Sequence, residues 1–116
     1  MQILFIVLND LSYQETILQL FIKHKVRGAT ILDSEGMAKA VLEYEGLGML
    51  LGGPFAQSVA QSPASSKTIF SVIPDEKIVC DLIDDIQSAL ENSRQKTIGF
   101  MFTLPVSGIY PLKAKK

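Results

Sequence analysis

The chain of 116 residues has little of what most catalytic and metal sites are built from, since it contains one histidine, one cysteine and no tryptophan. His24 and Cys80 lie far apart in the sequence and give no metal-ligand spacing, so we predict no metal site. A single cysteine cannot form an internal disulfide, which is typical of a reducing compartment. We expect Cys80 to be a small buried residue on a helix rather than a reactive thiol.

The chain also lacks an excess of charge and a long apolar run. Eleven basic and twelve acidic side chains give a formal net charge of −1, which provides no electrostatic footprint for nucleic acid. No apolar run approaches the roughly 20 residues of a membrane helix. The N-terminal residues show neither a basic region nor a small-residue cleavage site. We therefore expect a cytoplasmic protein that is not an integral membrane protein and does not bind nucleic acid.

The first half of the chain shows a strand–helix–strand pattern. Residues 3–8 form a dense apolar run of strand length. Ser12 and Glu15 have the spacing of a capping box, which predicts a helix to about Lys25 with Gly28 as its C-cap. Residues 29–33 predict the second strand.

A second strand–helix–strand pattern follows later in the chain. Residues 67–73 predict a strand, and Asp75 is the expected N-cap of the next helix. That helix has one apolar stripe and an opposite acidic face. Residues 97–104 predict the last main strand, and residues 109–112 a short terminal edge strand.

Two such units predict an α+β fold of the ferredoxin-like βαβ-βαβ type in one domain, residues 1–116, with an antiparallel sheet and two helices on one face. The hydrophobic fraction of 47% is high for so short a chain. We expect the other face of the sheet to be covered by a second subunit, and hence an oligomer.

Residues 36–66 interrupt this pattern between the second and third strands, with five glycines and two prolines. A connection of this length in a small domain is either functional or disordered. Its glycines match neither a phosphate-binding P-loop nor a dinucleotide-binding motif. Residues 46–56 carry no charge, so we expect an apolar tip that docks on a partner, with a turn of helix at residues 38–44.

No catalytic constellation is apparent in the sequence. His24 is expected to face solvent or to interact with the end of the first helix. Asp81, Asp84 and Asp85 are expected to form a solvated face of the second helix. No nucleophile is placed beside a base, so we predict that the protein is not an enzyme.

Three segments together resemble the P-II nitrogen-regulatory signalling proteins. Residues 28–38 (GATILDSEGMA) are similar to the family's second strand and the turn that opens its long T-loop. Residues 67–76 (KTIFSVIPDE) are similar to its third strand ending in Val-Pro-Asp, and residues 102–106 (FTLPV) to its strand ending in Ser-Pro-Val. The resemblance covers nearly the whole chain in order and spacing. It implies the same fold, a homotrimer, signal transduction, and a T-loop at residues 36–66.

The resemblance also implies a nucleotide site between subunits, since family members bind ATP, ADP and often 2-oxoglutarate in such clefts. Thr30, Gly36, Met37 and Ala38 match positions on the adenine side. On the phosphate side this chain departs from the family, because Phe100 stands at the lysine position and Pro111 and Lys113 at the two arginine positions. Phosphate recognition depends on Lys and Arg, so Arg94, Lys96 and Lys113 are the candidate cations, from shifted positions.

These expectations combine into a non-enzymatic regulatory protein that binds a small ligand, with ATP or ADP as the candidate, and acts on a partner protein through residues 36–66. Two alternatives remain. One is a ferredoxin-like trimer of the divalent-cation tolerance type, and the other is a protein-interaction module with vestigial clefts.

Overall fold

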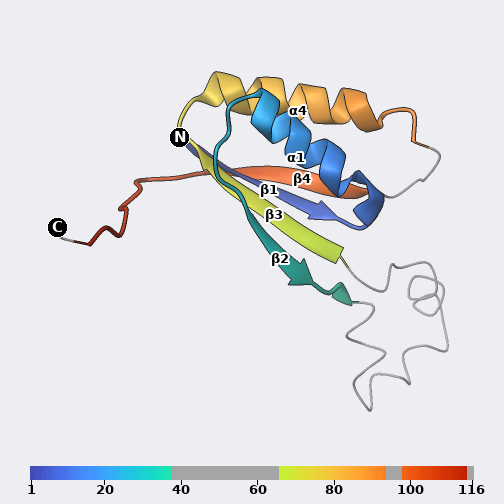
Figure 1. The fold of residues 1–116 in the computed structure, drawn as a ribbon, viewed down its shortest axis with the longest axis horizontal. Helices are drawn as coiled ribbons and strands as arrows, with labels where there is room; N and C mark the ends of the chain where they lie inside the picture. The colour runs from blue at the N-terminus through green and yellow to red at the C-terminus, as the bar shows by residue number, and fades with distance from the viewer. Residues whose placement is uncertain (38–65, 94–97, 115–116) are drawn as a thin grey trace, which may run out of the picture.

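The computed structural model describes residues 1–37, 66–93 and 98–114, and these form one antiparallel sheet with two α-helices on one face (Figure 1). The sheet order is β2-β3-β1-β4. The strands are β1 (Gln2–Leu8), β2 (Thr30–Ser34), β3 (Ser66–Ile73) and β4 (Gly99–Pro105). The helices are α1 (Gln14–Lys23) and α4 (Glu76–Leu90). The predicted ferredoxin-like architecture is thereby confirmed.

The central strand β1 sets the division of the sheet into two faces. Ile6 of β1 lies opposite Ile69 of β3 and Met101 of β4. Because side chains alternate along a strand, this row and its neighbours two residues away point toward the helices. The core between helices and sheet is apolar throughout. It consists of Leu4, Ile6, Leu8, Ile17, Phe21, Ile69, Ile73, Val79, Leu82 and Ile86.

Helix α4 begins as the sequence predicts. The Asp75 carboxylate accepts a hydrogen bond from the backbone N–H of Lys77 at 2.9 Å, which satisfies one of the helix's unpaired N-terminal donors. Val79, Leu82 and Ile86 form the buried stripe. The prediction that Cys80 is buried is wrong: its side chain is exposed, because one residue of an α-helix turns the side chain about 100° away from the stripe.

The start of α1 differs from the predicted capping box. Asp10, rather than Ser12, is the capping residue, and it caps a 3-10 turn (Leu11–Tyr13) that precedes the α-helix. Its carboxylate accepts from the Ser12 backbone N–H at 3.1 Å and from the Ser12 hydroxyl at 2.6 Å. Ser12 is therefore a donor to the cap and not the cap itself.

The end of α1 also differs, since Lys25 takes the role predicted for Gly28. Lys25 has φ of 62°. Its N–H donates to Ile22 O at 3.0 Å, and the Val26 N–H donates to Phe21 O at 2.9 Å. This pair of bonds is a Schellman motif, in which the left-handed position is usually glycine. The chain therefore turns three residues before Gly28.

The segment after β4 forms no strand, so the terminal edge strand expected at residues 109–112 is absent from the described residues 106–114. Val106 N–H donates to Met1 O at 3.1 Å. Beyond this bond the segment runs out from the sheet, away from both helices (Figure 1).

Candidate functional site

The face of the sheet opposite the helices is apolar, and the described residues leave it open. Its exposed large apolar side chains come from three strands, and their exposed fractions reach 58% at Phe100. They are Leu32, Val72, Phe100, Phe102 and Leu104. Large exposed apolar patches are uncommon on monomeric domains and are typical of interaction surfaces. We call these five residues the open face.

A row of aromatic rings crosses the middle of this face. The register places Phe70, Phe5 and Phe102 side by side on β3, β1 and β4. The rings of Phe5 and Phe102 stack with centroids 4.9 Å apart and an interplanar angle of 12°, and Phe5 and Phe70 are 5.5 Å apart. Stacked pairs add stability beyond their buried area. The rings are thus held in a fixed arrangement before anything covers them.

The residues predicted for the adenine side lie on or just after β2. Thr30 extends the aromatic row, since it stands opposite Phe70. Gly36 and Met37 follow the end of β2 and are exposed. Ala38 lies outside the described residues, as do the rest of the expected T-loop to residue 65 and its expected turn of helix at residues 38–44.

Of the cations predicted for the phosphate side, Lys113 alone lies among the described residues. Lys113 is exposed in the segment after β4. Arg94 and Lys96 precede β4 and lie outside the described residues. In the order β2-β3-β1-β4, three strand spacings of about 4.8 Å each, roughly 14 Å in all, separate β2 from β4. Thr30 therefore lies on the β2 edge, whereas Lys113 follows the strand at the opposite edge.

Gly99 lies at the start of β4, at a position where the structure requires glycine. The sequence alone did not reveal this requirement. The φ of Gly99 is +157°, and a Cβ on this residue would lie 2.1 Å from the backbone oxygen of Val7. Only glycine permits this close approach of β4 to β1. The neighbouring Phe100 points onto the open face. Its ring stacks on Phe102 with centroids 6.1 Å apart.

Three hydroxyl groups lie together where β2 ends and β3 begins. Ser34 and Ser66 are hydrogen-bonded through their hydroxyls at 2.7 Å, and Thr68 donates to Ser34 at 3.0 Å. On the other side of the hairpin Lys67 donates to Asp33 at 2.7 Å. This hydrogen bond, reinforced by the lysine charge, holds the pKa of the Asp33 carboxyl below its ordinary value. These contacts fix the base from which residues 36–66 depart.

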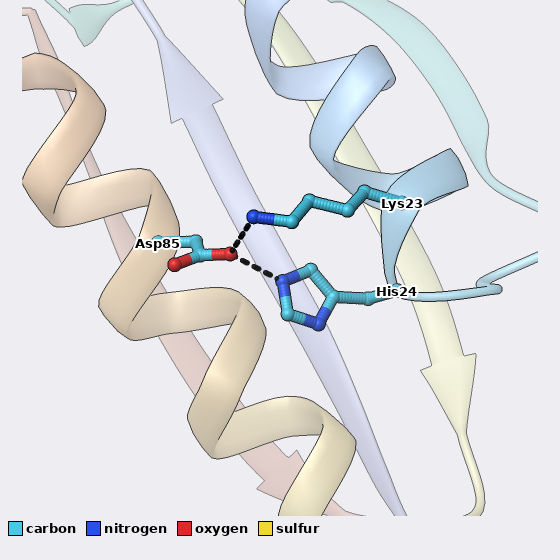
Figure 2. A network of polar contacts seen from close by, with 3 residues as sticks. All are labelled: Lys23, His24 and Asp85. Atoms are coloured by element: carbon cyan, nitrogen blue, oxygen red, sulfur yellow. Dashed lines mark hydrogen bonds and ion pairs between the residues drawn. The ribbon is translucent and has the colours of Figure 1, made fainter.

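His24 takes part in a link between the two helices (Figure 2). Its Nε2 lies 2.6 Å from Oδ2 of Asp85, and Lys23 Nζ lies 3.1 Å from the same oxygen. The hydrogen bond from His24, followed by that from Lys23, lowers the pKa of the Asp85 carboxyl. Of the two environments expected for His24, the solvent-facing one is wrong, because its side chain is 17% exposed. Spacing could not reveal a contact between residues 61 positions apart.

Two cavities lie at opposite ends of the helix–sheet layer. One, of about 500 Å³, lies between residues 25–28 and the start of α4, with Val26, Ile73 and Ile78 in its wall. The Ser71 hydroxyl at its edge donates to the carbonyl of Gly28. The other, of about 490 Å³, lies beside the end of α4, where Glu91 and Ser93 meet apolar core residues. Neither cavity contains a predicted site residue.

Within the described ranges, no group of histidine, cysteine and acidic residues is placed to hold a metal ion. No helix among those same residues is long and apolar enough to cross a membrane. Comparison with models of protein families and with curated proteins found no match to this chain.

Proposed function

We propose that this protein is a non-enzymatic regulatory oligomer of the P-II type, in which subunits enclose small-ligand clefts. The observation that carries the proposal is the open face. The chain builds a regular sheet, covers one side with its own helices, and leaves stacked phenylalanines on the other. Phe100 and Phe102 remain 58% and 41% exposed. Burial of such surface is the main driving force of protein association.

Head-to-tail packing of copies would also complete the predicted ligand site. Thr30, Gly36 and Met37 belong to the β2 edge, and Lys113 follows the β4 edge. When the β2 edge of one copy meets the β4 edge of the next, Thr30 of one copy and Lys113 of the other would belong to the same interface. Repetition of that contact closes a ring if the rotation permits. A homotrimer is the ring that we propose.

The chemistry of the described residues supports ligand binding rather than catalysis. His24 is occupied by Asp85 and holds two helices together. Cys80 is exposed on α4. A general base needs a nucleophile or substrate within hydrogen-bond reach. The proposed ligand is an adenine nucleotide, bound by backbone and Thr30 on one side and by Arg94, Lys96 and Lys113 on the other.

In this proposal residues 36–66 carry the signal to a partner protein. They leave the sheet between Ser34 and Ser66, directly beside the proposed cleft. A ligand that contacts Gly36 and Met37 would favour one arrangement of this segment over another. Such a difference in contacts is what couples ligand to partner binding.

Calorimetric titration of the purified full chain with ATP and ADP tests the proposal, with light scattering on the same sample. We expect saturable binding and the mass of a trimer. Lys113→Glu should weaken ATP binding at least ten-fold, because it replaces a cation by an anion in the phosphate half of the cleft. Lys77→Glu, an equal charge change in the first turn of α4, is the matched control. No saturable binding up to millimolar nucleotide would refute the nucleotide cleft.

The open face also favours a second candidate, an interaction module whose clefts hold no ligand. The two functions differ in the role of residues 46–56, the uncharged tip of the loop. Replacement of this tip by a Gly/Ser linker should abolish partner capture and preserve nucleotide affinity if the cleft is real.

The alternative of a trimer of the divalent-cation tolerance type is tested by calorimetric titration of the same protein with divalent cations.

A further inference from the structure

The segment that follows β4 projects away from the rest of the described chain (Figure 1). Residues 106–114, which we call the C-terminal arm, leave the sheet in an extended path (Figure 1). The exposed fractions of Ile109, Tyr110 and Leu112 are 47%, 86% and 100%. The Tyr110 ring folds back against Gly108, where a Cβ would lie 3.0 Å from the tyrosine oxygen. The arm thus presents apolar side chains that the rest of the described chain does not cover.

The opposite edge of the sheet offers a matching surface. β2 is the last strand in the order and pairs only with β3, so its other edge is unpaired among the described strands. Ile31 and Leu32 are 38% and 50% exposed. Natural edge strands usually avoid added strands through proline, lysine or a bulge. β2 (TILDS) has no proline or lysine, and its one charge, Asp33, is paired with Lys67.

The arm is too short to pair with β2 of its own chain. Ile109 and Tyr110 lie four and five residues beyond the end of β4, a path of at most about 18 Å when fully extended. To lie outside β2 the arm must first cross four strand spacings, roughly 19 Å. Thr30 lies a further three residues from the end of β3, since it stands opposite Phe70 while the strand ends at Ile73. Ile109 and Tyr110 would therefore not reach the outer edge of β2 in their own chain.

We propose that the C-terminal arm of one copy adds as a strand to the unpaired edge of β2 in the next copy. Donor and acceptor lie at opposite edges of the same sheet, so each copy can give one arm and receive one. A contact of this kind is heterologous and can close a ring. The inference rests on the self-association proposed above, but it needs neither the nucleotide nor the partner protein.

The sequence of the arm fits this role. Main-chain hydrogen bonds give added strands their affinity, and alternate side chains give specificity. Ile109 and Tyr110 are residue types that favour strands. As neighbours they would point to opposite faces of the extended sheet, one beside Ile31 and the other beside Leu32. Pro111 has no N–H, so it would end the ladder.

Cross-linking between differently tagged chains tests the arm directly. In a Cys80→Ser background, Ile109→Cys in one chain and Leu32→Cys in the other are coexpressed and treated with a short bis-maleimide. We expect a mixed covalent dimer at least ten-fold above a control with Gln19→Cys on α1 in place of Leu32→Cys. A yield no higher than the control, in a sample that sizes as an oligomer, would overturn the arm and leave the proposed oligomer intact.

A second variant tests the contribution of the arm without cross-linking. Ile109→Asp with Tyr110→Asp in the full chain should raise the concentration at which the oligomer dissociates at least ten-fold, while circular dichroism stays unchanged. Unchanged dissociation would count against the arm alone. A wild-type chain that is monomeric at every concentration would overturn both the arm and the regulatory oligomer. Cross-linking without nucleotide binding would remove only the ligand from the proposed function.

Discussion

The two faces of one sheet differ in what completes them. On the helix side, Leu4, Ile69 and Leu82 are 0% exposed and the chain provides its own cover. On the other side, Phe100 and Leu104 of β4 are 58% and 50% exposed. Both faces are apolar. The difference is that two amphipathic helices were available for only one of them.

This contrast separates folding from assembly within a single strand. Successive residues of β4 alternate between the two faces, so Met101 packs against the core while Phe100 and Phe102 face outward. A substitution at one residue should therefore act on the free energy of unfolding, and a substitution at its neighbour on association. The predictions below test how completely the two effects separate.

The largest expected effect is on the covered face. Leu4→Ala should lower the free energy of unfolding by about 3 kcal/mol, since it removes a fully buried side chain and leaves a cavity. Leu104→Ala, the same change on the open face, should cost under about 1 kcal/mol in the dilute chain. Chemical denaturation at low protein concentration measures both. Equal losses would mean that the open face is already buried within a single chain.

The next effect is on association. Phe102→Lys should raise the dissociation constant of the proposed oligomer at least 100-fold, about 2.7 kcal/mol, because each interface of the ring would bury the introduced charge. Light scattering across a dilution series gives the constant. Ile22→Lys is the matched control, since Ile22 is 74% exposed on the helix side. If both variants dissociate alike, the oligomer does not form through the open face.

A smaller effect concerns the link between the helices that cover the sheet. The folded-state pKa of Asp85 is lowered from 3.8. The ionised carboxylate therefore contributes stability above about pH 4. That contribution is lost as pH falls below 3.8 through the lowered folded value. Asp85→Asn should lower stability at pH 7 and flatten the loss of stability below pH 4.

Thermal unfolding between pH 2 and pH 7 measures this dependence. Asp84→Asn, on an exposed residue of the same helix, serves as control and should retain the wild-type slope. A wild-type slope in Asp85→Asn would show that the contact with His24 and Lys23 contributes nothing to stability in solution. Many exposed ion pairs behave in this way.

The fold followed from the sequence because its signals are local and periodic. The stripe Val79, Leu82 and Ile86 and the cap at Asp75 each depend on neighbours within a helical turn. The prediction that Cys80 is buried was wrong because its small side chain is compatible with a buried or an exposed position. Asp10 was missed as the cap because a 3-10 turn displaced the helix start by a few residues, a boundary effect that pattern reasoning rarely resolves.

The candidate site was harder to predict from the sequence, because its residues come together only through the order of the strands. The need for cover on one face followed from composition, but the stack of Phe5, Phe70 and Phe102 required the register. The placement of Thr30 and Lys113 at opposite edges required the topology. The contact of His24 with Asp85 joins two helices and has no signature in spacing.

The smallest effect tests how α1 closes over the covered face. Lys25 occupies a left-handed conformation, φ 62°, at the end of α1, where a side chain is penalised and glycine is not. Lys25→Gly should therefore raise the free energy of unfolding by about 0.5–1 kcal/mol. Lys23→Gly, two residues earlier and inside the helix, should lower it instead, since glycine there costs about 1 kcal/mol and the bond to Asp85 is lost. Association through the open face should be unchanged in Lys25→Gly, because Lys25 belongs to the turn after α1. A gain in stability accompanied by weaker association would show that the two faces are coupled through the helix layer.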